Sequence, residues 1–123
     1  MRNIGIFCII DDPFDPPGHG RFGGGHVFMF DLGRYLIRAG NCVTYITRKN
    51  SEEKSTLEEL GPNCTLFRIP VGPPEDIVAE EVGAFIDPLF EATVEFFSQR
   101  ECPDIIHAQY WVSGELVRRL RKR

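Results

Sequence analysis

The sequence lacks the marks of several large classes of protein. It has no apolar run near the roughly 18–20 residues that cross a bilayer, and its short apolar start has no small-residue cleavage site of a signal peptide. The four cysteines form no CxxC pair, and no histidine stands at zinc-finger spacing from them. Internal repeats, linkers and low-complexity segments are also missing. We therefore expect a cytoplasmic protein with buried, reduced thiols and no transmembrane segment.

The composition is that of one globular domain. The 123 residues are 42% hydrophobic and 26% charged, which suits a single domain over residues 1–123 with a buried core. The net charge is −4, yet five of the last six residues are basic. Such a tail can bind anionic lipid or nucleic acid, or it can be the C-terminal turn of a helix. Nothing else in the sequence indicates nucleic-acid binding, so we favour the helix.

Hydrophobic periodicity predicts alternating strands and helices. The expected strands are 3–10, 43–47, 64–69 and 104–107. The expected helices are 26–39, 51–60, 79–99 or 87–99, and one from 113 into the basic tail. This alternation predicts an α/β fold, a Rossmann-like parallel sheet flanked by helices. Ligands of such folds bind beyond the C-terminal ends of the strands, where we expect three loop regions to gather: 11–25, 48–50 with 70–75, and 107–114.

Two of these helices carry more detailed expectations. The helix 26–39 should turn one apolar stripe toward the sheet, formed by Phe28, Leu32, Tyr35, Leu36 and Ala39. Gly40 with Asn41 should end that helix. In the helix 87–99, Pro88 should lie in the first turn with Asp87 as the N-cap.

The loop after the first strand is rich in glycine. Gly18, Gly20 and Gly23 form a G-x-G-x-x-G pattern, but seven residues, three of them proline, separate it from the strand. In a dinucleotide-binding fingerprint the glycines follow the strand directly. An NADP-linked oxidoreductase, with Thr47-Arg48-Lys49 as its basic residues, is therefore disfavoured. The loop also has no G-K-[ST] of a phosphate-binding P-loop.

The glycines that adjoin the helix are more informative. Gly23, Gly24 and Gly25 directly precede it, and without Cβ atoms they allow a phosphate to approach the backbone. The free N–H groups and the helix dipole favour a phosphate, a pyrophosphate or a developing anion at this position.

Three aspartates stand near the start of the same loop. Asp11, Asp12 and Asp15 lack the D-x-[DN]-x-[DN]-G spacing of a calcium loop. Aspartate side chains commonly bond to the backbone of turns. We therefore expect turn chemistry here and no metal site.

Three spaced blocks resemble the family-4 retaining glycosyltransferases. They are GGGHVFMFDLGRYLIRAGNCVTYITRK at 23–49, RIPVGPP at 68–74 and PDIIHAQYWVSGELV at 103–117. They follow the family's order, cover essentially the whole chain, and most resemble the sucrose-phosphate-synthase-like and glycosyl-inositol-phosphate-forming subgroup. The resemblance implies the N-terminal domain of the GT-B fold. It also implies transfer of a hexose, with retention, from a nucleotide-sugar to a small sugar, sugar-phosphate or related acceptor, without a cofactor or catalytic metal.

The resemblance implies roles for residues at two of the loops. Gly23, Gly24 and Gly25 match the family's glycine loop, which lies under the donor phosphates. Arg48 matches the basic residue at the end of the second strand and is expected to face a charged acceptor.

The third block contains the residues that the resemblance assigns to the catalytic centre. His107 matches the first histidine of the family's His-x-His-Tyr-Trp motif, and Gln109 replaces the second, which contacts the donor sugar. Both are assigned to the catalytic centre. Tyr110 and Trp111 match the aromatic pair and are assigned to the acceptor. Gln109 can donate and accept hydrogen bonds, but it cannot carry a proton near neutral pH.

The resemblance also implies that the functional enzyme is larger than this chain. In the family this half continues with further strand–helix units and a second Rossmann-like domain, which supplies the cations that bind the nucleotide-sugar, whereas this chain stops at Arg123. We expect an incomplete domain that is inactive alone and has a separate C-terminal glycosyltransferase domain as its partner. We also expect it to self-associate through an exposed edge or apolar face of the sheet. The alternative is a non-catalytic subunit that binds a sugar phosphate or a protein.

Overall fold

The computed structural model of the chain describes residues 1–16 and 25–122. The strands are β1 (Asn3–Phe7), β2 (Cys42–Arg48), β3 (Leu57–Gly61), β4 (Cys64–Ile69) and β5 (Ile105–Ala108). The helices are α1 (Gly25–Arg38), α2 (Ala79–Gly83), α3 (Ile86–Ser98) and α4 (Tyr110–Arg121).

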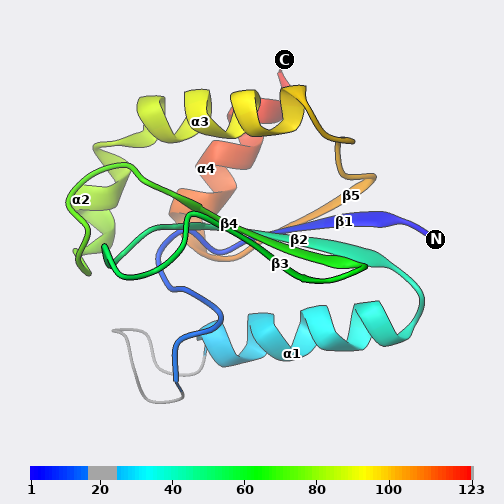
Figure 1. The fold of residues 1–123 in the computed structure, drawn as a ribbon. Coiled ribbons are helices and arrows are strands. Elements are labelled where there is room, and N and C mark those ends of the chain that lie inside the picture. Colours follow the sequence, from blue (N-terminus) through cyan, green and yellow to red (C-terminus); the bar gives the residue numbers. More distant parts are fainter. Residues whose placement is uncertain (17–24, 123) are drawn as a thin grey trace.

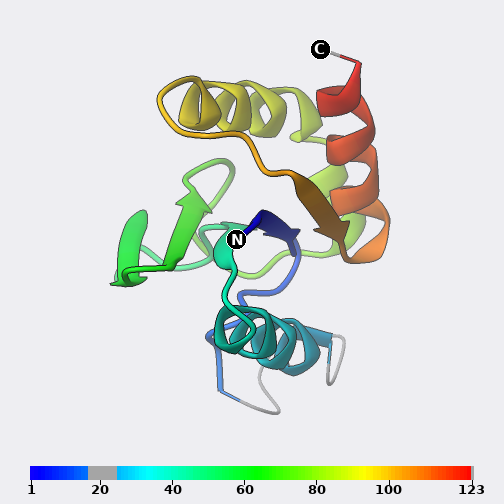
Figure 2. The same cartoon turned by 90° about the vertical axis from the view of Figure 1, so that its right-hand side faces the viewer.

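Five strands form one sheet between two helical layers. Their spatial order is β3-β4-β2-β1-β5, in which β1, β2, β4 and β5 are parallel and β3 is antiparallel to β4. Figure 1 shows α1 below the sheet and α3 above it. Figure 2, turned by 90°, shows α4 beside β5 and next to α3. The α/β Rossmann-like fold is confirmed, and among the described residues β3 is the strand that departs from the parallel arrangement.

Each face of the sheet has its own hydrophobic core. The core on the α1 side contains Ile4, Ile6, Cys8, Met29, Val43, Tyr45, Cys64 and Leu66. The core on the other side contains Phe7, Ile9, Ile46, Ile69, Ala79, Val82, Leu89, Val112 and Leu116. Because residues paired in register point to the same face, His107 lies with its partner Ile6 on the α1 side.

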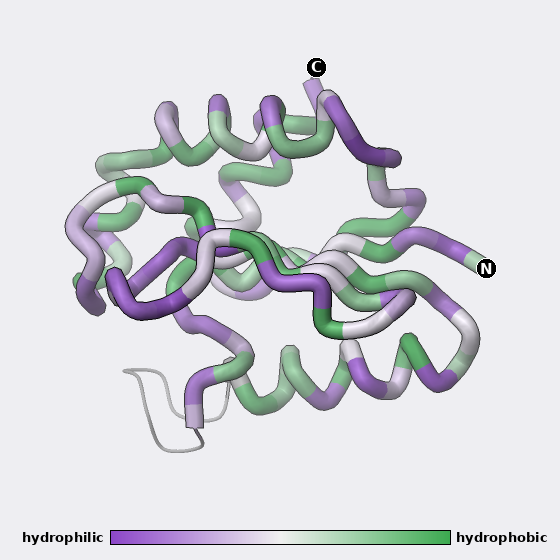
Figure 3. The backbone as a smooth tube through the Cα atoms, viewed as in Figure 1, coloured by the Kyte–Doolittle hydropathy of each residue, from purple (hydrophilic) through white to green (hydrophobic). Residues whose placement is uncertain are grey.

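The stripe that α1 turns to the sheet differs from the predicted one. Phe28 and Tyr35 are 55% and 69% exposed, whereas Met29 is fully buried. Gly33 is also buried, and a Cβ there would lie 1.7 Å from the hydroxyl oxygen of Tyr45. The missing side chain at Gly33 lets the helix approach β2, which rotates Phe28 and Tyr35 outward. Hydrophobic and hydrophilic residues alternate along α1 (Figure 3), as expected for a helix that covers the sheet with one side.

The predicted helix over 51–60 is wrong. Residues 51–56 form turns and bends, and the residues that follow form β3, which pairs with β4. Glu58 of β3 accepts a hydrogen bond from Arg68 of β4. A polar segment of ten residues has little helical stability of its own, so the pairing with β4 decides its conformation.

The helical segment 79–99 is divided into two helices. α2 ends at Gly83, and α3 begins at Ile86 with Phe85 as its N-cap, so the prediction of Asp87 as the N-cap is wrong. Pro88 does lie in the first turn of α3, where its missing N–H is tolerated.

The last helix begins three residues earlier than predicted. α4 starts at Tyr110 rather than Ser113, so the predicted loop 107–114 is largely helical. Its last turn contains Arg118, Arg119 and Arg121. Arg119 donates to the carboxylate of Asp87 in α3. Residues 118–122 of the basic tail are therefore the end of a helix, as we favoured.

β5 forms one end of the sheet and is partly uncovered. On the α1 side, Ile105 is 45% exposed. On the other side, a cavity of about 470 Å³ lies between α3, α4 and β5, and its lining includes Phe97, Ile106 and Leu120. An open strand edge of this kind can pair with another chain. Self-association through it stays a prediction.

Residues 1–16 and 25–122 include no helix that is both long and apolar enough to cross a membrane.

All four cysteines are free thiols. Cys8 and Cys64 are buried, Cys42 is half-buried and Cys102 is exposed, so the expectation of buried thiols is wrong for Cys102. Burial, followed by the negative charges of nearby aspartates, raises the pKa of Cys8 well above its ordinary value. Cys8 is therefore a packing residue rather than a reactive thiol.

Candidate functional site

The C-terminal ends of the four parallel strands lie along one edge of the sheet, which we call the carboxyl edge. Backbone bonds continue there beyond the strands: the Cys8 amide donates to the Ile46 carbonyl, and the Gln109 amide donates to the Phe7 carbonyl, both at 2.9 Å. α1 begins at the same edge (Figure 1). The predicted loops therefore start from one side of the molecule, where α/β folds bind their ligands.

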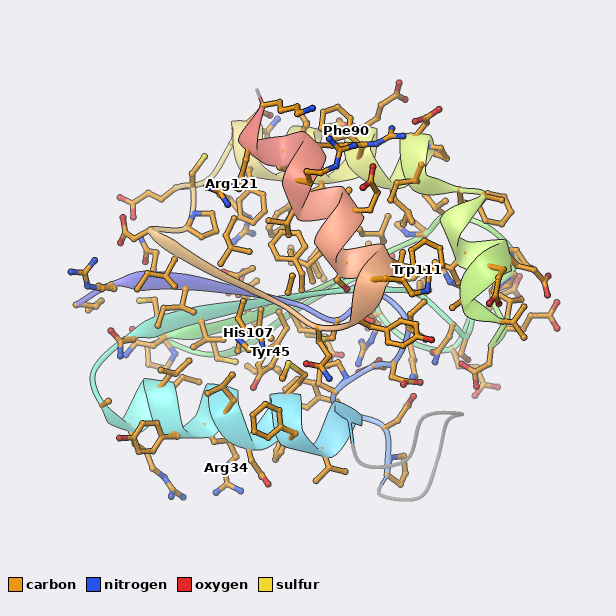
Figure 4. The ribbon with its side chains drawn as sticks, turned by 180° about the vertical axis from the view of Figure 1, so that it is seen from behind. Arg34, Tyr45, Phe90, His107, Trp111 and Arg121 are labelled. Atoms are coloured by element: carbon orange, nitrogen blue, oxygen red, sulfur yellow. The ribbon has the colours of Figure 1, made fainter. Side chains whose placement is uncertain are left out.

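His107 and Gln109 lie at the turn from β5 into α4. His107 is half-buried in β5, and Figure 4 shows it with Tyr45 between the sheet and α1. Gln109 is the N-cap residue of α4, with its backbone extended. Tyr110 has φ 72°, the left-handed region that side chains rarely adopt. This strained residue lets the chain pass from strand to helix within one position, which keeps Gln109 at the carboxyl edge.

Ser113 joins α4 to the end of β1. Its hydroxyl is fully buried and accepts a hydrogen bond of 2.9 Å from the Ile9 amide. The bond fixes the start of α4 against the carboxyl edge. No sequence pattern assigned this role to Ser113.

We predict that Ser113→Ala lowers the free energy of unfolding by about 1–2 kcal/mol, because it leaves the Ile9 amide without its acceptor. Ser98→Ala is the matched control, since Ser98 is exposed and its hydroxyl donates to the nearby Glu95 carbonyl. Urea denaturation measures both variants, and equal effects would contradict the buried role of Ser113.

The two aromatic residues at the start of α4 are exposed. Tyr110 is 44% and Trp111 is 50% accessible. Trp111 lies against Gly83 of α2, where a Cβ would come within 2.7 Å of the indole. Figure 4 shows Trp111 at the end of α4 that adjoins α2. Both rings are partly exposed at the carboxyl edge, and their role toward an acceptor stays a prediction.

Arg48, expected to face a charged acceptor, is 3% exposed. Its Nη1 donates to the carbonyls of Pro73 (2.7 Å), Val71 (3.2 Å) and Lys49 (3.2 Å), and its Nη2 donates to the Glu75 carbonyl. The side chain therefore joins β2 to the loop before α2. An acceptor contact by Arg48 is untested.

A buried ion pair holds the loop that follows β1. Asp12 is 1% and Arg68 is 5% exposed, and Arg68 Nε lies 2.7 Å from Asp12 Oδ2. The Phe14 amide donates to Asp12 Oδ1 at 2.8 Å, so the predicted turn chemistry is confirmed for Asp12. The ion pair itself was missed, although Arg68 gave a signal. It follows Cys64 and Leu66 on the α1 face of β4, and a charge on a buried face requires a partner.

Lys54 and Asn50 extend this pair into a network. Lys54 Nζ lies 3.0 Å from Asp12 and 2.5 Å from Asp15. Asn50 Nδ2 donates to Asp15 at 3.3 Å and to Asp76 at 2.8 Å. The loops after β1, β2 and β4 are thus connected through side chains.

The helix start that could hold an anion is described only in part. Gly25 is the first residue of α1, which has 14 residues. Gly23 and Gly24 lie outside the described residues. The proposed phosphate contact of all three glycines stays a prediction. In the parts described, 1–16 and 25–122, no three side chains of His, Cys, Asp or Glu are grouped as a metal site.

Comparison with known proteins gives matches over nearly the whole chain. Residues 23–123 match the family described as Glycosyl transferase 4-like domain. The chain is 29% identical over 117 residues to a D-inositol 3-phosphate glycosyltransferase of Geodermatophilus obscurus, a match that covers 94% of this chain and 26% of that protein. It is 30% identical over 118 residues to the protein of the same name from Kribbella flavida, with coverage of 94% and 28%.

A solved structure has the same fold. A sucrose-phosphate synthase from Thermosynechococcus elongatus superimposes with a TM-score of 0.89 at 28% identity, covering 100% of this chain and 31% of that one. The chain therefore spans less than a third of the length of these relatives.

Proposed function

Because the chain belongs to the glycosyl transferase 4-like domain family, we propose that it is the acceptor-side domain of a retaining hexosyltransferase. The reaction moves a hexose from a nucleotide-sugar to a small sugar, sugar-phosphate or related acceptor, and it needs no cofactor besides that donor. The observation that carries this proposal is the meeting of the α1 start and the β5–α4 turn at one carboxyl edge. We further propose that the protein acts in the cytoplasm.

Each part of this edge has a task in the proposed reaction. The free N–H groups at the start of α1, with Gly23, Gly24 and Gly25, favour the donor phosphates. Gln109 and His107 lie where the transferred sugar would bind. Gln109 contributes hydrogen bonds to the sugar hydroxyls rather than a proton.

Four described cations near the carboxyl edge contact other groups of the chain, and one of them, Lys49, contacts the Thr56 hydroxyl at 3.4 Å. Arg68 and Lys54 are bound to Asp12, and Arg48 is bound to loop carbonyls. Stabilisation of a developing diphosphate requires positive charge directed at it. We propose that a second glycosyltransferase domain supplies this charge, in agreement with the greater length of the relatives.

We predict hexose transfer from a panel of common nucleotide-hexoses only when a C-terminal glycosyltransferase domain is supplied together with this chain. Gln109→Ala should lower the transfer rate on the order of 10²-fold, because it removes a positioned hydrogen-bonding group. Gln99→Ala, an exposed residue at the C-cap of α3, is the matched control and should leave the rate unchanged. Radiolabelled product formation measures both variants.

Two outcomes of this experiment would end the catalytic proposal. The complemented pair could transfer no hexose from any donor, or Gln99→Ala could reduce transfer as much as Gln109→Ala. Tight binding of a sugar phosphate without any transfer would favour the alternative, a non-catalytic subunit. The histidine-to-glutamine departure at Gln109 is the observation that favours this alternative.

A further inference from the structure

The loop between β4 and α2 wraps around a single side chain. A guanidinium group has five N–H donors in a rigid plane. The guanidinium of Arg48 donates to the carbonyls of Val71, Pro73 and Glu75 in this loop. It also donates to the carbonyl of the next residue, Lys49. Three carbonyls of one short loop therefore point inward at one buried cation.

The backbone of this loop has few N–H donors of its own. Gly72 has φ 76°, and Pro73 and Pro74 lack N–H groups. Within the loop, the Val71 amide donates to the Ile69 carbonyl and the Glu75 amide to the Pro73 carbonyl. These two bonds tie the loop to itself and to the end of β4, whereas Arg48 ties it to β2 in the middle of the sheet.

We propose that Arg48 is a positioning residue. Its guanidinium holds residues 71–75 in the shape that forms the acceptor-side wall of the carboxyl edge, and it does not bind the acceptor itself. The inference rests on the proposed function only in taking this loop as part of the acceptor side. It replaces the expected contact between Arg48 and a charged acceptor with an indirect role.

The two possible roles of Arg48 predict different effects of the acceptor's charge on its binding affinity. A cation that contacts a phosphate contributes to binding of a phosphorylated acceptor and little to binding of its neutral form. A cation that shapes a loop contributes equally to binding of both forms, because both would contact the same loop. Inositol 3-phosphate and inositol form such a matched pair of probes.

The test combines amide NMR spectra of the 14.0 kDa chain with titrations of the two probes. Arg48→Met removes the guanidinium and keeps the length of the side chain. Gly72→Ala disturbs the same loop and keeps Arg48, because φ 76° is strained for alanine and the added Cβ would lie 3.1 Å from Phe85. Arg38→Met removes one positive charge from the exposed last turn of α1 and serves as the charge control.

Arg48→Met and Gly72→Ala should both shift the amide resonances of Val71 and Glu75 and speed their exchange. Both should weaken binding of inositol and inositol 3-phosphate by equal factors, on the order of 10–100-fold. Arg38→Met should leave the loop resonances and both affinities unchanged. In the unsubstituted chain, the Arg48 guanidinium protons should exchange slowly, a readout that survives if Arg48→Met fails to fold.

Two results would overturn the positioning role. One is loss of affinity for inositol 3-phosphate alone in Arg48→Met while the loop amides keep their positions. The other is fast exchange of the Arg48 guanidinium protons in the unsubstituted chain. If neither probe binds, inositol is not the acceptor, and the loop resonances still decide the role of Arg48.

Discussion

Replacing Asp12 with asparagine is expected to lower the free energy of unfolding by about 3–5 kcal/mol. The substitution puts a neutral amide in place of the carboxylate 2.7 Å from Nε of Arg68, which is 5% exposed. The carboxylate partner that Arg68 keeps, Glu58, has a 36% exposed side chain and is therefore the weaker of the two. It also weakens the tie to Lys54 at 3.0 Å. Urea denaturation monitored by circular dichroism measures the change.

An exposed ion pair supplies the matched control. Asp87 also pairs with an arginine, Arg119, but its side chain is 77% exposed. Exposed pairs contribute about 0–1 kcal/mol, so Asp87→Asn should cost no more than this. If the two asparagine variants lose equal stability, burial is not what makes the Asp12 pair important.

The Asp12 pair also predicts how stability depends on pH. Burial alone would raise the pKa of Asp12, but hydrogen bonds from Arg68 and the Phe14 amide, with the charge of Lys54, hold the pKa below its ordinary value of 3.8. A carboxyl with a lowered folded-state pKa stabilises the protein above its unfolded pKa and loses this contribution as the pH falls through the folded value. The difference between the unsubstituted chain and Asp12→Asn should therefore be constant near neutral pH and shrink below about pH 4.

Patterns that depend on burial predicted most of the fold correctly. A near-continuous apolar run marked β1 as a strand buried on both faces, and β-branched residues marked β2 as a strand. The end of α1 was also predictable, because Gly40, with φ 94°, can adopt the left-handed conformation that terminates a helix. These signals lie within the segments themselves, and the structure has the strands and the helix end that they predict.

The errors occur where distant contacts decide the conformation. β3 was predicted as a helix because its own residues are polar, yet its partner β4 and the buried Arg68 hold it as a strand. The stripe of α1 was displaced because the close approach at Gly33 depends on Tyr45 of β2. Neither contact has a signature within the segment that it shapes.

In the candidate site, too, the features set by local sequence were predictable and those set by distant contacts were not. The positions of His107 and Gln109 at the end of a strand followed from the alternation of elements. The left-handed conformation of Tyr110 and the buried bond from Ile9 to Ser113 did not, because both depend on how α4 packs. Arg48 was found as a basic residue at a strand end, but its direction toward the loop carbonyls is a property of the assembled fold.

Replacing Gly33 with alanine is expected to lower the free energy of unfolding by about 2–3 kcal/mol. The new Cβ would lie 1.7 Å from the hydroxyl oxygen of Tyr45 and 2.4 Å from the ring carbon that carries it. Tyr45 is 1% exposed and donates to the carbonyl of Phe30 at 3.1 Å, so the ring cannot move without loss of packing and of this bond. Thermal and urea denaturation measure the loss.

Replacing Gly114 with alanine is expected to have the opposite effect on stability. Gly114 lies inside α4, and a Cβ there would meet no atom within 4 Å. Alanine is favoured over glycine in a helix by about 0.5–1 kcal/mol, so Gly114→Ala should stabilise the chain while Gly33→Ala destabilises it. Equal effects at the two positions would contradict the close approach of α1 to Tyr45.

A double substitution identifies the contact that causes the loss. Tyr45→Phe removes the hydroxyl at 1.7 Å but leaves the ring carbon at 2.4 Å, so it should relieve only part of the overlap. Gly33→Ala with Tyr45→Phe should therefore be more stable than the sum of the two single changes predicts, with a coupling of about 0.5–2 kcal/mol. If the two changes are additive, Gly33→Ala acts elsewhere in α1, and the rotation that exposes Phe28 and Tyr35 has another cause.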